Sequence, residues 1–203
     1  MKGVESIVRP RALLLDMDGT ITQPMLDFPR IKREMSIGNR PILEALAEMS
    51  DANRAAAEEV LARHEEEAAE NSSLNGGCAE LLAWIAEHGV VTALVTRNTR
   101  SSVQTVLAKH GLSFGTLIAR EDAPFKPDPR PLRLACDRLR VDPADAWMVG
   151  DGQYDVEAGR AAEMRTVWIS HARPRAFGAV PWRTVRGLPE LVELLRSCVA
   201  VRP

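Results

Sequence analysis

Short apolar runs alternate with segments of helical periodicity along most of the chain. The unbroken runs are typical of strands buried on both faces of a parallel sheet. They are Ala12–Asp16, Val90–Thr96, Ala146–Gly150, Thr166–Ile169 and, more weakly, Thr116–Ala119. The helical segments are Ala79–His88, Ser101–His110, Arg130–Leu139, Val156–Ala162 and the closing Leu188–Cys198. This alternation predicts a parallel α/β fold with right-handed crossovers.

One segment interrupts the alternation after the first strand. It contains no strand pattern, but Pro41–Met49 and Ala52–Glu70 have helical character, and Asp27 can begin a further helix. Because long unstructured loops are rare in compact domains, we predict a small all-helical lobe over residues 22–75. Residues 1–21 and 76–203 then form the α/β domain. We expect Glu65-Glu66-Glu67 to lie on a solvated helix surface, since consecutive residues do not share a helix face.

Composition narrows the class of protein. Hydrophobic residues make up 45% of the 203 residues, which favours a folded core. The net charge of −2 gives no reason to expect nucleic acid or a membrane surface as a partner. The three cysteines are far apart in sequence, which fits neither a disulfide framework nor a zinc site and favours a cytoplasmic location. No apolar stretch is long enough for a signal peptide or a membrane span.

Two carboxylates follow the first predicted strand, in the run Leu13-Leu14-Leu15-Asp16-Met17-Asp18-Gly19-Thr20. On an extended backbone Asp16 and Asp18 point to the same side. Two neighbouring carboxylates repel each other unless a cation joins them. Open α/β sheets bind their ligands at the carboxyl ends of strands. The run therefore predicts a metal site.

Further polar groups follow other strands. They are Thr96, Lys126 in Phe125-Lys126-Pro127, and Asp151 with Asp155 in Gly150-Asp151-Gly152-Gln153-Tyr154-Asp155. Each has an ordinary explanation alone: a helix cap, a surface lysine or a turn. Together with the Asp16 and Asp18 pair, these groups would require four coincidences at the carboxyl ends of strands in one sheet. We therefore predict that the groups share one site.

Taken together, the residues Asp16 to Thr20, Thr96, Lys126, and Gly150-Asp151 with Asp155 resemble the haloacid dehalogenase-like hydrolase superfamily. The resemblance is to its phosphatase branch with a small helical cap, the phosphoglycolate phosphatase-like proteins. It implies a Rossmann-like parallel sheet with helices on both faces and a helical cap inserted after the first strand. It also implies Mg²⁺-dependent hydrolysis of a small phosphorylated metabolite by a monomer or homodimer.

The resemblance assigns roles to the carboxylates. Asp16 would be the nucleophile that forms an aspartyl-phosphate, and Asp18 the general acid and then base. By analogy, Mg²⁺ would be held by the Asp16 carboxylate, the Asp18 backbone carbonyl and Asp151. Asp155 would hold Lys126 or a metal-bound water.

The resemblance also implies phosphate and substrate contacts. Thr96 would donate a hydrogen bond to a phosphoryl oxygen, and Lys126 would supply fixed positive charge. Gly19, Arg97 and Asn98 would lie against the phosphate or the substrate. The lobe would select the substrate. It carries a group of basic residues: Arg30, Lys32, Arg33 and Arg40. This basic group either binds a second anionic group, as in a small phosphorylated carboxylate, or forms a solvated helix face.

Two residues depart from the family pattern. Gly152 stands where many relatives carry Ser or Thr, so a hydroxyl that could orient Asp151 is missing. Glu163 stands where many carry Gly, which questions the geometry of the local turn.

Three other functions compete with a phosphatase. A β-phosphoglucomutase-like isomerase keeps both aspartates and the helical cap, so the core motifs do not exclude it. A receiver-like signalling domain carries its phosphorylated Asp on a later strand, and no isolated Asp ends a middle strand before Thr96. A non-catalytic phosphate-binding protein could share the fold, although the full set of chemical groups argues against it. Relatives that cleave carbon–halogen bonds lack the second acid, so Asp18 favours phosphate esters.

Overall fold

A computed structural model describes residues 7–199 and divides the chain into two compact units. The first unit comprises the described residues up to Gln23, Ser73–Arg97 and the described residues from Ser113 onward. The second comprises Pro24–Ser72 and Asn98–Leu112. The second unit thus includes a segment that the sequence pattern assigned to the α/β domain. The domain boundaries at residues 22 and 75 stay a prediction.

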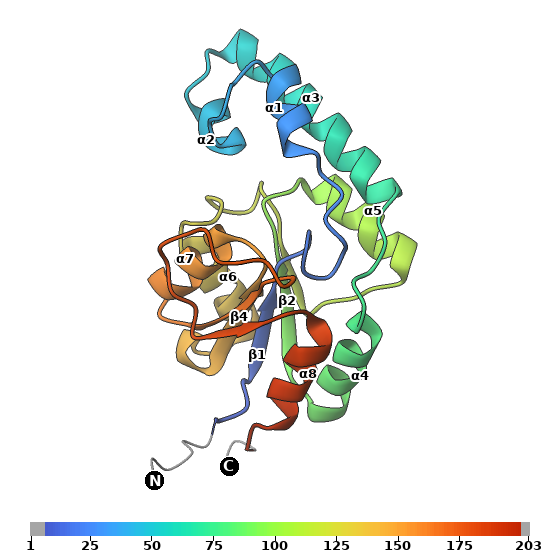
Figure 1. The fold of residues 1–203 in the computed structure, drawn as a ribbon, viewed down its shortest axis with the longest axis vertical. Coiled ribbons are helices and arrows are strands. Elements are labelled where there is room, and N and C mark those ends of the chain that lie inside the picture. The colour runs from blue at the N-terminus through green and yellow to red at the C-terminus, as the bar shows by residue number, and fades with distance from the viewer. Residues whose placement is uncertain (1–6, 200–203) are drawn as a thin grey trace. The chain divides into compact units, whose positions relative to one another are not determined.

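The first unit is built on a parallel sheet of six strands in the order β3-β2-β1-β4-β5-β6 (Figure 1). The strands are β1 (Ala12–Leu15), β2 (Val91–Val95), β3 (Thr116–Ile118), β4 (Ala146–Gly150), β5 (Arg165–Ile169) and β6 (Arg183–Val185). Five of them match the predicted runs. The sequence pattern missed β6, a short edge strand in which only Val185 is buried.

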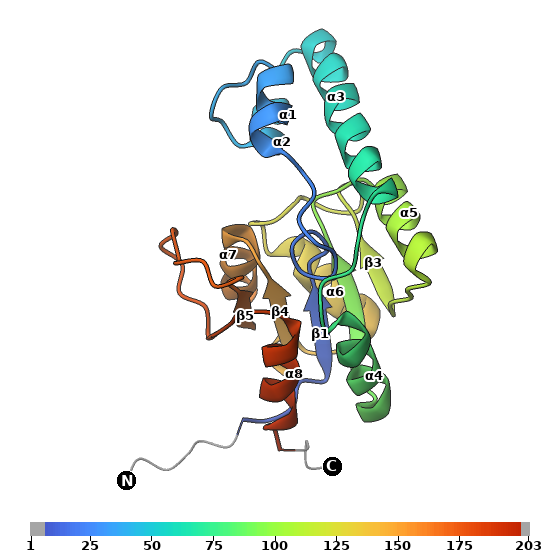
Figure 2. The same ribbon diagram turned by 45° about the vertical axis from the view of Figure 1, so that its right-hand side comes forward.

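Helices cover both faces of the sheet, which confirms the predicted α/β class. The helices of this unit are α4 (Cys78–His88), α6 (Arg130–Leu139), α7 (Gln153–Ala161) and α8 (Leu188–Arg196), with the 3-10 turn Pro143–Asp145 before β4. Figure 2 shows α4 and α8 side by side in front of the sheet and α6 behind it. Alternating strand residues such as Leu14, Val95 and Met148 pack on Leu132 of α6 and Ala158 of α7.

The register of the central strands aligns their carboxyl ends. Leu15 of β1 pairs with Leu94 of β2 on one side and with Val149 of β4 on the other. The residues that follow these strands therefore meet at one edge of the sheet, because parallel strands all end on the same side. This register brings the residues that follow the three strands, Asp16, Thr96 and Asp151, to the same edge of the sheet.

The turn after α7 contains the departure noted at Glu163. Its φ of 63° is in the left-handed region, which favours glycine. The left-handed turn that the sequence questioned is therefore made at Glu163 without a glycine.

Among the described residues, no helix is both long and apolar enough to cross a membrane.

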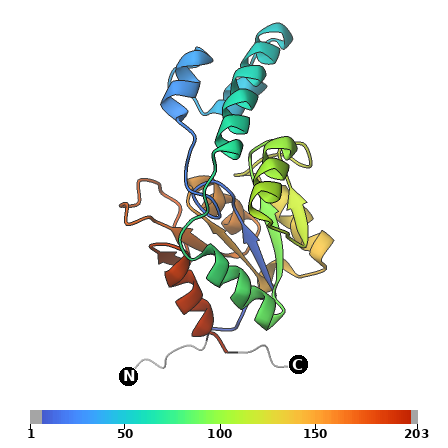
Figure 3. The same cartoon turned by 90° about the vertical axis from the view of Figure 1, so that its right-hand side faces the viewer.

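The second unit is helical: α1 (Phe28–Glu34), α2 (Ile42–Ala47), α3 (Asp51–Glu70) and α5 (Arg100–His110). Asp27 begins α1 as expected, because its carboxylate accepts a hydrogen bond from the Arg30 amide at 2.9 Å. Helix α3 packs against α1, α2 and α5, and Figure 3 shows α1 beside α3.

The expectation of a solvated surface at Glu65-Glu66-Glu67 is wrong for Glu65. Its side chain is buried, and its carboxylate accepts from the Thr99 amide at 3.3 Å. Glu66 accepts from the Thr105 hydroxyl at 2.7 Å, and Glu67 is exposed. The reason is that α3 packs against α5, and N–H groups at the start of α5 attract carboxylates.

Glu34 is the centre of an ion-pair cluster in the second unit. Its carboxylate oxygens lie 2.6 Å from Nη2 of Arg63, 3.0 Å from Nε2 of His64 and 2.9 Å from Nε of Arg30. These hydrogen bonds lower the pKa of Glu34 to about 2, and the bond from Arg63 has the largest effect.

We expect Glu34→Gln to flatten the dependence of stability on pH in the acid range. Because the pKa in the folded state lies below its ordinary value of 4.5, Glu34 adds stability above pH 4.5 that is lost as the pH falls toward 2. Thermal unfolding of both proteins between pH 7 and pH 2 measures this contribution. The melting temperatures should differ at pH 7 and converge in acid, whereas Glu58→Gln, at an exposed position of α3, should follow the wild type throughout.

Candidate active site

The Asp16 carboxylate lies where β1 ends in the middle of the sheet. The four residues of β1 are fully buried between β2 and β4, and the Asp16 amide donates to the carbonyl of Val149 at 2.9 Å. The strand therefore fixes the backbone of Asp16 on a rigid element. Only 9% of the residue is exposed.

Lys126 is a buried cation rather than a surface lysine. Its Nζ donates to Oδ1 of Asp16 at 2.7 Å, to Oδ1 of Asp155 at 2.6 Å and to the carbonyl of Val95 at 2.7 Å. These bonds use the three donors of the ammonium group. Burial lowers the pKa of Lys126, but the two carboxylates outweigh it, so the net shift is upward. The ammonium group therefore stays charged beside Asp16.

Asp155 is held on its other side by the loop that precedes α7. Its Oδ2 accepts from the Gly152 amide at 3.0 Å. A Cβ at Gly150 would overlap the Asp155 carboxylate, so the glycine that ends β4 makes room for it. Asp155 thus links α7 to Lys126. Its role in the site stays a prediction.

Asp16, Asp151 and Asp155 form a compact group in which one carboxylate oxygen from each lies within 4.8 Å of the others. Burial is the main cause that raises the pKa of Asp16, with Lys126 opposing it and Asp155 and Asp151 adding to it. Burial also raises the pKa of Asp151, followed by the charge of Asp155, while Arg173 opposes both. The pKa values of Asp16 and Asp151 are thus raised mainly because burial disfavours their charged forms.

The donor set of this group fits Mg²⁺, which prefers carboxylate oxygens. Among the described residues, hydrogen bonds and ion pairs engage Oδ1 of Asp16 and Oδ2 of Asp151. The second oxygens of both carboxylates are therefore available to a cation.

The turn after Asp16 depends on Gly19, whose φ is 76°. A Cβ at this position would overlap the Asp151 carboxylate, so only glycine allows the turn to approach Asp151. The Met17 carbonyl accepts from the amides of Thr20, Ile21 and Thr22, which closes the turn. Asp18 is half-buried, and its Oδ1 lies 3.4 Å from the Thr22 hydroxyl.

Thr96 and Arg97 follow β2. Thr96 is buried, and its amide donates to the carbonyl of Ile118 at 3.0 Å. The Arg97 guanidinium donates to the Lys126 carbonyl at 2.7 Å and lies 4.1 Å from the centre of the Tyr154 ring. Arg97 therefore contacts the backbone of the lysine that binds Asp16. Asn98 is buried and belongs to the second unit.

Three of the four residues in the predicted basic group Arg30, Lys32, Arg33 and Arg40 have contacts within the second unit. Arg30 pairs with Glu34, Lys32 donates to the Asn39 carbonyl, and Arg40 pairs with Glu48.

The sequence interpretation missed the segment between β5 and β6. Nε2 of His171 lies 2.6 Å from the Gly19 carbonyl, and Nη2 of Arg173 lies 3.0 Å from Oδ2 of Asp151. Trp168, on β5, donates from its indole nitrogen to the Asp151 carbonyl at 2.9 Å. His171 and Arg173 could have been found from the sequence because they follow the carboxyl end of a predicted strand, as Asp16 and Asp151 do.

Comparison with known proteins finds similarity over most of the chain. The family model described as haloacid dehalogenase-like hydrolase matches residues 24–163. N-acetylmuramic acid 6-phosphate phosphatase of Pseudomonas putida is 32% identical in an alignment 188 residues long, which covers 81% of this chain and 84% of that protein. Phosphoglycolate phosphatase of the same species is 28% identical, and the alignment covers 86% of this chain and 77% of that protein. The crystal structure of a hydrolase from Pseudomonas syringae superposes with a TM-score of 0.78 at 17% identity, over 97% of this chain and all of that one.

Proposed function

The chain belongs to the haloacid dehalogenase-like hydrolase family, and from this premise we propose that it is a Mg²⁺-dependent phosphatase of small phosphorylated carboxylates that works through an aspartyl-phosphate. One observation carries the proposal: a carboxylate at the end of the central strand lies 2.7 Å from a buried lysine and beside two further carboxylates. An in-line nucleophile, fixed positive charge and room for a cation are what phosphoryl transfer requires.

The chemistry has two steps. In the first, the Asp16 carboxylate attacks phosphorus, and the bond to the ester oxygen breaks as Asp18 gives that oxygen its proton. In the second, Asp18 takes a proton from water, the water oxygen attacks phosphorus, and the bond to Asp16 breaks to release phosphate. Lys126 offsets the negative charge that develops on the phosphoryl oxygens, and the Thr96 hydroxyl donates a hydrogen bond to one of them.

The metal would be held by the Asp16 carboxylate, the Asp18 carbonyl and Asp151, and would supply positive charge between the nucleophile and the phosphate. Asp155 would keep Lys126 in place from the side of α7, as their 2.6 Å contact supports.

The relatives support a substrate class. The two phosphatases compared above are named for N-acetylmuramic acid 6-phosphate and for phosphoglycolate. Each of these compounds combines a phosphate monoester with a carboxylic acid. For this chain we therefore propose a substrate with both groups.

A panel of phosphomonoesters tests the proposed function. Phosphate release should require Mg²⁺, stop on chelation and return when the metal is restored. Phosphoglycolate should be turned over faster than ethyl phosphate, which lacks the carboxylate. Equal rates would contradict the substrate class. Rapid interconversion of glucose phosphates in ³¹P NMR, with little phosphate released, would instead favour an isomerase.

We expect Asp18→Asn to slow phosphate release by about 10²- to 10⁴-fold, the usual contribution of a general acid and base. For the first step, the loss of rate should be smallest with p-nitrophenyl phosphate as the substrate, because its leaving group needs little protonation. Rapid-quench kinetics separates the two steps. An equal loss in the first step for ethyl and p-nitrophenyl esters would contradict the role of Asp18 as an acid.

A further inference from the structure

The position of Arg173 has a consequence for the metal site. We propose that Arg173 and the divalent cation compete for the Asp151 carboxylate, so that Arg173 sets the affinity of the site for Mg²⁺. This inference rests on the proposed function, because it takes Asp151 to be a metal ligand.

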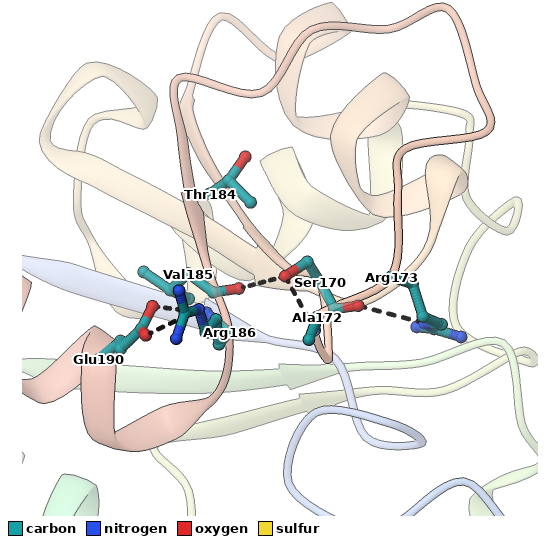
Figure 4. A pocket seen from close by; sticks show the side chains of 7 residues that line it. All are labelled: Ser170, Ala172, Arg173, Thr184, Val185, Arg186 and Glu190. Atoms are coloured by element: carbon teal, nitrogen blue, oxygen red, sulfur yellow. Dashed lines mark hydrogen bonds and ion pairs between the residues drawn. The ribbon is translucent and has the colours of Figure 1, made fainter.

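The turn that carries Arg173 is firmly held. The hydroxyl of Ser170 donates to the Val185 carbonyl at 3.1 Å, and the amide of Ala172 donates back to that hydroxyl at 3.3 Å (Figure 4). His171 and Ala172 both have positive φ, 49° and 59°, which turns the chain sharply. Nε of Arg173 donates to the Ser170 carbonyl at 3.2 Å, which aims the far end of the guanidinium at Asp151.

The charge of Arg173 opposes a metal at Asp151. Its Nη2 lies 3.0 Å from Oδ2 of Asp151, so a cation bound to Oδ1 of the same carboxylate would meet a like charge a few ångströms away. Two such charges repel strongly in a partly buried site. Binding of Mg²⁺ therefore either displaces the guanidinium or is weakened by it.

The Arg173 side chain can leave at low cost. It is 55% exposed, so water can solvate its charge. On one side it lines an open pocket of about 450 Å³, which gives it room to move. Figure 4 shows the pocket with its lining residues: Ser170, Ala172, Arg173, Thr184, Val185, Arg186 and Glu190.

Calorimetric titration of the metal-free protein with Mg²⁺ tests the proposal without measuring activity. Arg173→Gln should bind Mg²⁺ about tenfold more tightly than the wild type, since the competing charge is gone. Arg173→Lys should stay within about threefold of the wild type, because the charge is kept. Arg175→Gln is the matched control: it removes the same charge from the same segment, where Arg175 contacts the Ala179 carbonyl, and its effect should be less than about twofold.

The outcomes separate this proposal from the proposed function. Mg²⁺ binding by the wild type with unchanged or weaker binding by Arg173→Gln would overturn the competition but leave the phosphatase in place. Weaker binding by Arg173→Lys would also overturn it, because it would mean that the guanidinium orients Asp151 for the metal. If the wild type and every variant fail to bind Mg²⁺, the proposed metal site fails and the competition with it. Melting curves of the metal-free proteins check folding, and if Arg173→Gln is unfolded, Arg173→Met takes its place with the same expected result.

Discussion

Asp16→Asn should reduce phosphate release by about 10⁴-fold or more, the scale seen when a covalent nucleophile is removed. An amide oxygen is a poor nucleophile, and no other carboxylate of the group lies at the end of the central strand. The variant keeps the size and shape of the side chain, and its oxygen can still accept from Lys126. We therefore expect the fold to persist while the first chemical step stops.

The melting temperature of Asp16→Asn and a matched control substitution show whether activity is lost because the nucleophile is missing or because the protein unfolds. The melting temperature of Asp16→Asn should stay close to that of the wild type, because Lys126 keeps its bonds to Asp155 and Val95. Asp137→Asn, at an exposed position on α6, makes the same chemical change away from the site and should keep full activity. Turnover by Asp16→Asn within tenfold of the wild type would remove Asp16 from the role of nucleophile.

Lys126→Met should damage both stability and activity. Removing this cation leaves Asp16 and Asp155 buried without their partner, which typically costs about 3–5 kcal/mol in the free energy of unfolding. The loss of fixed positive charge should also slow phosphate release by about 10²- to 10³-fold. Denaturant unfolding and a phosphate-release assay measure the two effects.

Two further variants separate the loss of stability from the loss of activity. Lys109→Met removes an exposed lysine that donates to backbone carbonyls, and it should cost about 1 kcal/mol or less without slowing turnover. Adding Asp155→Asn to Lys126→Met removes one of the two unpaired carboxylates, so the double variant should be more stable than Lys126→Met while staying slow. If the double variant is no more stable than Lys126→Met, then Lys126 and Asp155 are not coupled, in contradiction to their 2.6 Å contact.

The central site follows from the sequence because its residues occupy the ends of strands. Asp16, Thr96 and Asp151 each come directly after an apolar run, and parallel strands bring such positions to one edge. Lys126 belongs to no such run, and only the structure places its ammonium group between Asp16 and Asp155.

The sequence interpretation missed three features whose contacts depend on tertiary packing. Glu65 is buried by the contact between α3 and α5, which the local pattern of α3 does not contain. β6 has only one buried residue, so it leaves no apolar run. His171 and Arg173 lie in a segment of ordinary loop composition, and their roles come from the sharp turn that directs them to Gly19 and Asp151.

In the proposed mechanism the phosphoryl group of the substrate is transferred to the Asp16 carboxylate before water releases it. Acid quenching during turnover, followed by reduction with borohydride, converts a phosphorylated aspartate to homoserine, which mass spectrometry of peptides can locate. Homoserine is expected at position 16 in the wild type, in an increased amount in Asp18→Asn, and not at all in Asp16→Asn. Turnover without homoserine at position 16, or homoserine at another aspartate, would rule out Asp16 as the nucleophile.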